Sequence, residues 1–372
     1  MEIKFKNIQK KIINKKILII TGQNSFKFSG AKDRILKLLK KKDTYIYYKT
    51  RRQPELQEFL RILKILNKFK PDMILGIGGG TSIDYSKLSS VFFNQKNIKK
   101  TIEKNLTFKI KKKIPTLIIP TTAGTGAEVT KFGTIFIKNK KFSFSSNLVK
   151  PNYFSIVPEF SLRSSDYVKA SSLMDTICQS TESLFSVNST KESIKYSLMS
   201  LKLAFKNWRK YIRSNDKKSS IEISRSSNFS GKAINISKTN GPHAVSYYFS
   251  TYHNLSHGHA VTLTINSFLF FNFINSKRAK KKINIDNRFK KLFKITKTNS
   301  IKDLNLFYQK IIDNLGLEIN FKKLKINIKK EIKNIINETN LERLKNNPIE
   351  LDKIDLYRII KNNEIKNFNK IN

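Results

Sequence analysis

The stretch Asp72-Met-Ile-Leu-Gly-Ile-Gly-Gly-Gly-Thr-Ser-Ile-Asp84 decides the predicted fold of this chain. Its first half is a short apolar run, typical of a strand buried in a parallel sheet. Glycines follow at once, and then a helical pattern begins. Such a turn lets a diphosphate approach the backbone, while the helix N-terminus supplies unpaired N–H groups. Because no Gly-Lys-Ser/Thr stands at the offset of a Walker loop, the stretch predicts a dinucleotide-binding turn.

Strands and helices alternate on both sides of this turn. We expect strands at 16–21, 44–48, 72–77 and 114–119, and helices at 31–40, 55–69 and after residue 80. This alternation predicts a doubly wound parallel sheet, that is, a Rossmann-like α/β domain. A second polar, glycine-rich turn follows the last of these strands, Pro120-Thr-Thr-Ala-Gly-Thr-Gly-Ala-Glu128. Two such turns at the carboxyl ends of parallel strands predict a dinucleotide in the crevice between them.

From about Pro158 onward the periodicity is helical, over 168–185, 192–211 and 261–273, with no convincing strand alternation. We therefore predict two domains. The first, residues 1–160, is an α/β dinucleotide-binding domain, and the second, residues 161–372, is an all-α domain for metal and substrate.

The composition narrows the function classes. Lys and Arg number 73 against 27 Asp and Glu, a net charge of +46, which raises the question of nucleic-acid binding. The excess is mostly lysine and is diffuse, and its runs at 40–42, 109–113 and 277–282 accompany no recognition motif, so we interpret them as solvated faces and expect no nucleic-acid partner. No apolar run reaches the length of a membrane span, the N-terminus lacks the pattern of a signal peptide, and the single Cys178 fits a reducing compartment. We expect a cytoplasmic protein without a membrane partner.

All four histidines fall within Gly241–His259. Imidazole is the commonest side-chain metal ligand and the usual proton carrier near neutral pH, so this window predicts a metal or proton-transfer site. On the helix expected at 168–185, Asp175, Gln179 and Glu182 share one face, because residues three and four apart are neighbours. Asp175, His243 and His257 could together bind one divalent cation, with Gln179 as a weaker fourth ligand.

These motifs together resemble the iron-containing (group III) alcohol dehydrogenases. The resemblance rests on Gly78–Lys87, Pro120–Thr130, Met174–Ser183 and the segment from His243 to Gly258, in that order. It implies NAD(P)H and a divalent metal, Fe²⁺ or Zn²⁺, as cofactors. It also implies metal ligation by Asp175, His243 and His257. Gln179 stands where the family has its fourth ligand, a histidine, which leaves metal identity and occupancy open. The implied cofactor contacts are Gly22, Gly78, Gly79, Gly80, Thr81, Asp84, Thr121, Thr122, Thr125 and Lys141.

The residue at position 22 bears on cofactor preference. Many NAD-preferring members carry an aspartate where this chain has Gly22. An acid there would repel a 2′-phosphate, so Gly22 leaves NADP(H) admissible, and the nearby lysines favour it.

Within the family, the chain resembles the branch of phosphonoacetaldehyde reductases, including the glutamine at 179. The stretches that carry this likeness are Cys178–Thr190, Gly241–Tyr247 and His257–Val261. The implied substrate is a small aldehyde or alcohol, an anionic phosphonate included, and the implied product is 2-hydroxyethylphosphonate. Ser186, Asn188, Ser189 and Thr190 could contact a phosphonate, but we favour a helix start for this polar segment.

The predicted chemistry is hydride transfer from the nicotinamide to an aldehyde, with His253, His259 or Tyr247 relaying the proton. For His259, a role in orienting His257 is the alternative. Three other functions stay open: a dehydrogenase for another small alcohol, a lyase or synthase of the same fold resembling dehydroquinate synthase, and a nucleotide-binding relative without activity. A homodimer is also left open.

Overall fold

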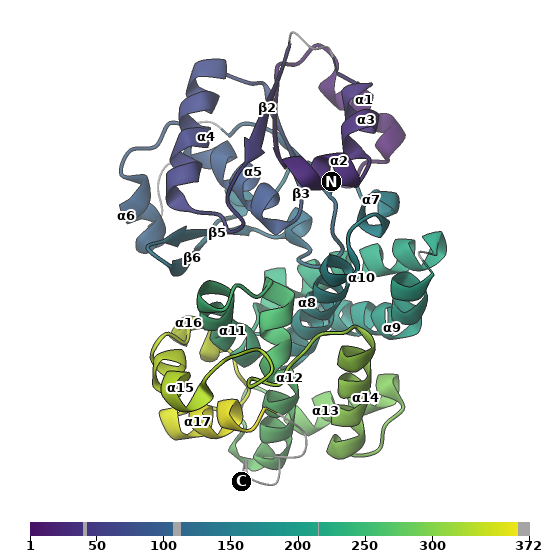
Figure 1. The fold of residues 1–372 in the computed structure, drawn as a ribbon, viewed down its shortest axis with the longest axis vertical. Helices are drawn as coiled ribbons and strands as arrows, with labels where there is room; N and C mark the ends of the chain where they lie inside the picture. Colours follow the sequence, from purple (N-terminus) through teal and green to yellow (C-terminus); the bar gives the residue numbers. More distant parts are fainter. Residues whose placement is uncertain (40–42, 107–112, 215, 364–372) are drawn as a thin grey trace. The chain divides into compact units, whose positions relative to one another are not determined.

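The chain folds into two compact units (Figure 1). The computed structural model describes residues 1–39, 43–106, 113–214 and 216–363, so the lysine run 40–42 and most of the run 109–113 lie outside the described residues. Unit 1 comprises Met1–Ser165 and Asn215–Ser224, and unit 2 comprises Asp166–Ser214 and Arg225–Asn372. The predicted boundary near residue 160 did not include the return of the chain to unit 1 at 215–224.

Unit 1 is built on a five-stranded parallel sheet of order β2-β1-β3-β4-β7. This confirms the predicted α/β class. Its strands are β1 (Ile17–Gly22), β2 (Thr44–Lys49), β3 (Met73–Gly78), β4 (Thr116–Pro120) and β7 (Tyr153–Phe154). The first four follow the predicted strands within two residues, because each is an apolar run bounded by polar or glycine residues.

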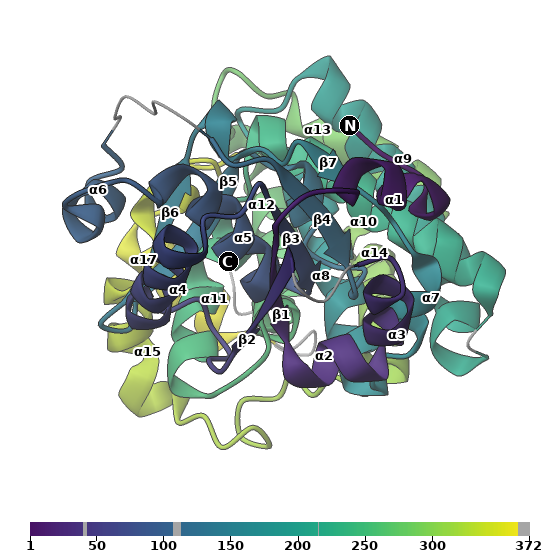
Figure 2. The same ribbon diagram turned by 90° about the horizontal axis from the view of Figure 1, so that it is seen from above.

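Both faces of this sheet are covered, which explains why its strands are continuous apolar runs. Successive side chains of a strand point to opposite faces. Leu18 and Ile20 accordingly pack with helices α4 (Leu56–Phe69) and α5 (Gly80–Phe92). Ile17 and Ile19 pack on the other face with side chains of α1 (Ile8–Ile12), α2 (Gln23–Phe28), α3 (Ala31–Leu36) and α7 (Pro158–Leu162). Figure 2 shows these helices on the two sides of the sheet.

Two local predictions differ from the structure. The helix predicted at 31–40 ends at Leu36, and the turn that follows lets Leu38 and Leu39 pack against the core. The antiparallel hairpin of β5 (Phe132–Ile137) and β6 (Lys140–Ser145) was not predicted. Its two-residue turn, Lys138-Asn139, has positive φ at both positions, 48° and 63°. A turn of this type usually contains glycine, so the sequence signal was weak.

Unit 2 is helical. After Phe154 the described chain forms no β-pairing beyond one isolated bridge. The predicted helical class of the C-terminal half is therefore confirmed. The helices from residue 166 on are α8 (Asp166–Phe185), α9 (Lys191–Arg213), α10 (Lys217–Ser237), α11 (Gly241–Tyr252), α12 (His257–Ile274), α13 (Ile285–Thr296), α14 (Ile301–Asn314), α15 (Ile328–Asn337), α16 (Leu341–Leu344) and α17 (Lys353–Lys361).

The remaining helical segments are short. Unit 1 also contains α6 (Ile98–Glu103), and 3₁₀ turns lie at Phe5–Asn7, Ala127–Val129, Asn147–Val149 and Ser276–Arg278. Thr190 caps α9 in a capping box with Ser193, which confirms the helix-start interpretation of this segment. Among the described residues, no helix combines the length and hydropathy needed to span a membrane.

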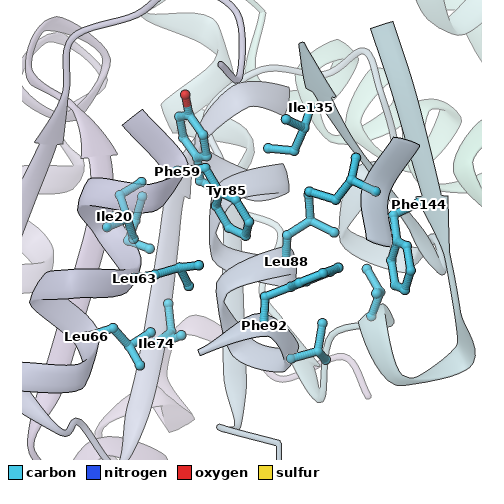
Figure 3. Packing of buried hydrophobic residues seen from close by; sticks show 14 of the residues in the cluster. Ile20, Phe59, Leu63, Leu66, Ile74, Tyr85, Leu88, Phe92, Ile135 and Phe144 are labelled. Carbon is cyan, nitrogen blue, oxygen red and sulfur yellow. The ribbon is translucent and has the colours of Figure 1, made fainter. Parts of the chain in front are cut away.

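Aromatic packing anchors one face of the sheet in unit 1 (Figure 3). Phe92 of α5 is fully buried, and its ring contacts those of Phe59 and Phe144 edge-on, at centroid distances of 5.9 and 4.9 Å. Such edge-to-face pairs add to the stabilisation from apolar burial.

Replacing Phe92 tests this packing. We expect Phe92→Ala to lower the free energy of unfolding by about 3–5 kcal/mol, because the change leaves a cavity that the sheet and helices cannot close. Urea unfolding followed by circular dichroism measures the effect. Phe28→Ala is the control: Phe28 is 62% exposed, so its loss should stay within about 0.5 kcal/mol. Equal effects at the two positions would contradict this account of the core.

Candidate functional site

Three helices of unit 2 bring together the three residues predicted to bind a metal. Asp175 lies on α8, His243 in the first turn of α11 and His257 at the start of α12. One ligand atom from each lies within 4.8 Å of those from the other two. Asp175 and His243 are buried, and His257 is half-buried. The arrangement offers one carboxylate and two imidazoles to a single point, a donor set that suits Fe²⁺ or Zn²⁺.

Two glycines allow these helices to approach one another closely. A Cβ atom on Gly258 would overlap the carbonyl oxygen of Ser171 and lie 2.8 Å from Cβ of Asp175. A Cβ on Gly241 would overlap the ring of Phe268. Glycine at 258 therefore lets the first turn of α12 lie directly against α8, which places His257 beside Asp175.

Glu182 orients His243. One carboxylate oxygen, Oε2, accepts hydrogen bonds from the backbone N–H groups of Asn240, at 2.8 Å, and His243, at 3.3 Å. The other, Oε1, pairs with Nδ1 of the His243 ring. A carboxylate can only accept, so Nδ1 carries a proton and the lone pair of a neutral ring lies on Nε2. Nε2 is the ring nitrogen that lies 3.4 Å from Oδ1 of Asp175.

The two atoms of this pair have no hydrogen-bond partner among the described residues. Oδ1 of Asp175 and Nε2 of His243 are buried, and neither makes a hydrogen bond with any residue that the structure describes. Buried polar atoms are ordinarily paired, so such atoms call for an explanation. Burial lowers the pKa of His243, but the nearby carboxylates of Glu182 and Asp175 more than offset this effect and raise the pKa overall. The site therefore attracts positive charge, and a divalent cation fits the residues present.

Gln179 lies one helical turn after Asp175 and is also buried. Its side-chain oxygen accepts a hydrogen bond of 3.0 Å from the hydroxyl of Ser230. That contact holds the amide in place and uses one lone pair of the oxygen, so only the second lone pair is available to bind a cation.

The three predicted proton relays differ in their surroundings. His253 pairs through Nε2 with Glu331, at 2.6 Å. His259 places Nε2 2.7 Å from the carbonyl of Glu318 and Nδ1 3.1 Å from the hydroxyl of Tyr167. Neither histidine belongs to the ligand cluster of the described residues.

Tyr247, in contrast, lies beside a predicted ligand. The centroid of its ring is 6.4 Å from that of His257. Burial raises the pKa of Tyr247, and the Arg343 guanidinium opposes part of that shift. The Tyr247 side chain thus remains a neutral hydroxyl near pH 7.

In unit 1, the two predicted cofactor turns lie next to each other. The backbone N–H of Thr121 donates to the carbonyl of Gly78 at 3.0 Å. Gly78 has a φ of +145°, which a side chain would strain. A Cβ on Gly79 would lie 3.5 Å from Thr122, and one on Gly80 would lie 3.2 Å from Thr125. Since α5 begins at Gly80, its unpaired N–H groups open beside these threonines, as a diphosphate site requires.

The remaining predicted cofactor residues have partners in the same unit. The hydroxyl of Thr81 donates to the carbonyl of Arg52 at 2.7 Å. Asp84 accepts two hydrogen bonds from Thr134, from the hydroxyl at 2.6 Å and from the backbone at 3.0 Å. Burial raises the pKa of Asp84, opposed by the charges of Lys87 and, more weakly, Lys141. Asp84 thus ties α5 to the β5–β6 hairpin that carries Lys141.

Gly22 ends β1 and caps α2. A Cβ atom added to it would lie 2.9 Å from the hydroxyl of Ser25 and 3.9 Å from Nζ of Lys49. The ammonium group of Lys49 therefore lies close to the space that a side chain at position 22 would occupy.

Comparison with known protein families identifies both halves of the chain. Residues 4–157 match the family described as iron-containing alcohol dehydrogenase, and residues 169–363 match its C-terminal region, described as Fe-containing alcohol dehydrogenase family, C-terminal. The chain belongs to the iron-containing alcohol dehydrogenase family. This confirms the resemblance inferred from the four sequence motifs.

Two known enzymes are similar to the chain over part of their length. A phosphonoacetaldehyde reductase of Streptomyces viridochromogenes is 28% identical over 216 residues, which are 56% of this chain and 55% of that protein. A long-chain-alcohol dehydrogenase of Geobacillus thermodenitrificans is 24% identical over 254 residues, 67% of this chain and 64% of its own. The chain thus spans about half to two-thirds of the length of these relatives.

Solved structures share the fold. The crystal structure of sulfoacetaldehyde reductase from Bifidobacterium kashiwanohense in complex with NAD⁺ superposes with a TM-score of 0.84. The alignment covers 97% of this chain and 95% of that one at 20% identity. At this identity the likeness establishes the fold.

Two residues of the site escaped the sequence analysis. Glu182 was noted on the face of Asp175, but no role was assigned to it, although its spacing of seven residues from Asp175 is two helical turns. Arg343, whose guanidinium carbon lies 5.9 Å from the centroid of the Tyr247 ring, was not considered. No local pattern distinguishes it from other cations of a chain with 73 Lys and Arg residues.

Proposed function

We propose that this protein reduces a small aldehyde to a primary alcohol, with NAD(P)H as reductant and a divalent cation, Fe²⁺ or Zn²⁺, held by Asp175, His243 and His257. The single observation that carries the proposal is the pair of buried, unpartnered atoms Oδ1 of Asp175 and Nε2 of His243, with His257 beside them. Gln179 is a secondary donor, since one lone pair of its amide oxygen is used by Ser230. Family membership of the chain supports the same activity.

The reaction is balanced as aldehyde, NAD(P)H and one proton giving alcohol and NAD(P)⁺. When bound, the nicotinamide supplies the hydride, and the cation supplies Lewis-acid stabilisation of negative charge on the substrate oxygen. The protein does the rest. The glycine turn at 78–80 and the threonines at 121, 122 and 125 bind the diphosphate, Glu182 holds the His243 ring with Nε2 directed at Asp175, and buried packing excludes water.

For proton delivery we favour Tyr247 among the three predicted relays. Its ring lies beside His257, whereas neither His253 nor His259 belongs to the ligand cluster of the described residues. A phenol can both donate and accept a hydrogen bond, as a proton relay requires.

For the substrate we propose an aldehyde with an anionic group, phosphonoacetaldehyde in the first place, giving 2-hydroxyethylphosphonate. The similar protein of Streptomyces viridochromogenes is a phosphonoacetaldehyde reductase. A net charge of +46 favours the approach of anions. We propose the cytoplasm as the location, because the chain's single cysteine, Cys178, is buried and free.

Turnover tests the proposal directly. Oxidation of NADPH and NADH by the purified protein is measured with phosphonoacetaldehyde and with propionaldehyde, before and after chelation, and with Fe²⁺ or Zn²⁺ added back. We expect turnover that chelation abolishes and metal restores. Cofactor binding without turnover of any aldehyde would instead indicate a nucleotide-binding relative, and turnover indifferent to chelation would remove the metal from the proposal.

Glu182→Gln tests the metal site apart from turnover. The amide is the same size but has one acceptor oxygen. If that oxygen keeps the backbone N–H groups, its NH₂ group faces Nδ1 of His243 and moves the ring proton to Nε2, the atom needed for the metal. We expect an affinity for Zn²⁺ about 10–100-fold weaker by competition with a chromophoric chelator. Glu192→Gln, at an exposed position on α9, is the control, and equal affinities in the two variants would refute this role.

Gly22→Asp tests the cofactor preference. An acid at the end of β1 would repel a 2′-phosphate and pair with Lys49, so we expect kcat/KM with NADPH to fall by at least about 10-fold while that with NADH is maintained. Gly22→Asn has the same shape without the charge and should leave the ratio of the two cofactors near that of the wild type. A parallel loss with both cofactors in the Asp variant would mean that position 22 does not face the ribose.

A further inference from the structure

Arg343 is fixed beside the helix that carries His243. The backbone N–H of Asn340 donates to the carbonyl of Ala244, at 3.1 Å, and Oδ1 of Asn340 accepts from the backbone N–H of Arg343, at 2.9 Å. Ala244 is the residue after His243 on α11. The first hydrogen bond docks the N-terminus of the short helix α16 on α11, and the second caps α16 and sets the starting point of the arginine side chain.

The guanidinium group reaches toward the ligand cluster. Nη1 donates to the hydroxyl of Thr239, a residue that is 1% exposed. The guanidinium carbon lies 5.9 Å from the centroid of the Tyr247 ring, and that ring is 6.4 Å from the ring of His257. Tyr247 thus lies near both the guanidinium and a candidate metal ligand.

Arg343 has no acidic partner within the part of the chain that the structure describes. The neighbouring Glu342 pairs with Lys238 at 3.0 Å, and Glu182 is held by His243. Arg343 is half-buried, and a guanidinium carries five N–H donors in a planar fork and keeps its charge at any physiological pH. A half-buried cation of this kind, next to a candidate catalytic site, is suited to a ligand that brings the missing negative charge.

We propose that Arg343, held by Thr239, binds the acidic group of the substrate. The substrate class is a short aldehyde that carries a tetrahedral oxyanion, a phosphonate or a sulfonate, on the carbon next to its carbonyl group. The inference rests on the proposed function, since it assigns the specificity of the same site. A planar fork pairs with two oxygens of such a group at once, which a single lysine cannot do.

The arginine differs in this respect from the general positive charge of the chain. A diffuse field raises the local concentration of every anion without selecting among them. A fork at a set position near the candidate metal ligands selects by the distance between the acidic group and the aldehyde. An uncharged aldehyde lacks the group that the fork binds, so loss of the arginine should affect charged substrates far more than uncharged ones.

Kinetics of two variants test the assignment in the full chain with its cofactors. For Arg343→Gln we expect kcat/KM to fall about 100-fold with phosphonoacetaldehyde or sulfoacetaldehyde, mostly through KM. Because Arg343 also lies beside Tyr247, propionaldehyde turnover should fall too, but through kcat and at least about 10-fold less. Arg343→Lys keeps the charge but not the fork and should recover part of the loss. Arg358→Gln removes an exposed arginine of α17 and controls for net charge. The aldehyde that shows the larger loss of kcat/KM in Arg343→Gln, the phosphonate or the sulfonate, carries the acid that the site prefers.

A binding measurement separates this inference from the activity. Ethylphosphonate and ethanesulfonate have the acidic group but no carbonyl to reduce, and their affinity is measured by titration calorimetry with wild type, Arg343→Gln and Arg358→Gln. We expect at least a 10-fold weaker affinity only in Arg343→Gln, with unchanged circular dichroism.

The outcomes distinguish the two proposals. Absence of turnover with every aldehyde would overturn the proposed function, while an affinity for ethylphosphonate that depends on Arg343 would still support the anion site. Turnover of propionaldehyde with no loss of anionic-substrate kcat/KM in Arg343→Gln would overturn the anion site and leave the reductase standing. An equal loss for charged and uncharged aldehydes, with unchanged binding of ethylphosphonate, would also overturn it.

Discussion

The candidate site in unit 2 depends on the interactions of one buried carboxylate, that of Glu182. It accepts hydrogen bonds from two backbone N–H groups at the start of α11 and pairs with the ring of His243. A carboxylate at a helix N-terminus is stabilised by the unpaired N–H groups and the helix dipole. The same group therefore caps α11, joins it to α8 and sets the tautomer of a candidate ligand. Truncating one partner of such a buried pair leaves an uncompensated charge, which is costly.

Close packing sets the third ligand. The lack of a side chain at Gly258 allows α12 to touch the backbone of α8 near Ser171, and α12 is buried along almost its whole length. A helix packed on all sides has no freedom to turn, because protein interiors are close-packed. The packing of α12 against α8 thus helps to set the direction of His257.

The charge of the site is opposite to that of the chain. The protein carries +46 overall, yet the candidate ligand cluster contains the buried carboxylate of Asp175, and the buried carboxylate of Glu182 pairs with its His243. Surface charges are screened over about 10 Å at 0.1 M salt, whereas buried ones are screened far less. The affinity of the cluster for a cation is therefore a local property, and the basic surface acts on anions at longer range. Arg343 is positively charged, like the surface, but it is held close to the cation-binding cluster.

The sequence by itself determined the class of the fold and the main candidate residues. Apolar runs bounded by glycine or polar residues marked the first four parallel strands, and the glycines at 78–80 marked the turn before α5. The clustering of four histidines predicted a metal or proton-transfer site, and Asp175, on the helix expected at 168–185, was its expected acidic ligand. These signals are local, because strand periodicity, helix spacing and glycine turns are set by neighbours in the chain.

Only the tertiary structure decided the contacts between distant segments. The hairpin of β5 and β6 depends on a turn without glycine that the core of unit 1 holds in place. Several contacts of the site join segments far apart in the sequence. They are the hydrogen bond between Gln179 and Ser230, the pairing of His253 with Glu331 and of His259 with Glu318, and the contact of Arg343 with Tyr247. Their physical basis is the docking of whole helices, as when α16 binds α11 through Asn340 and Ala244. Such docking depends on the shape of the packed core, which no short stretch of sequence contains.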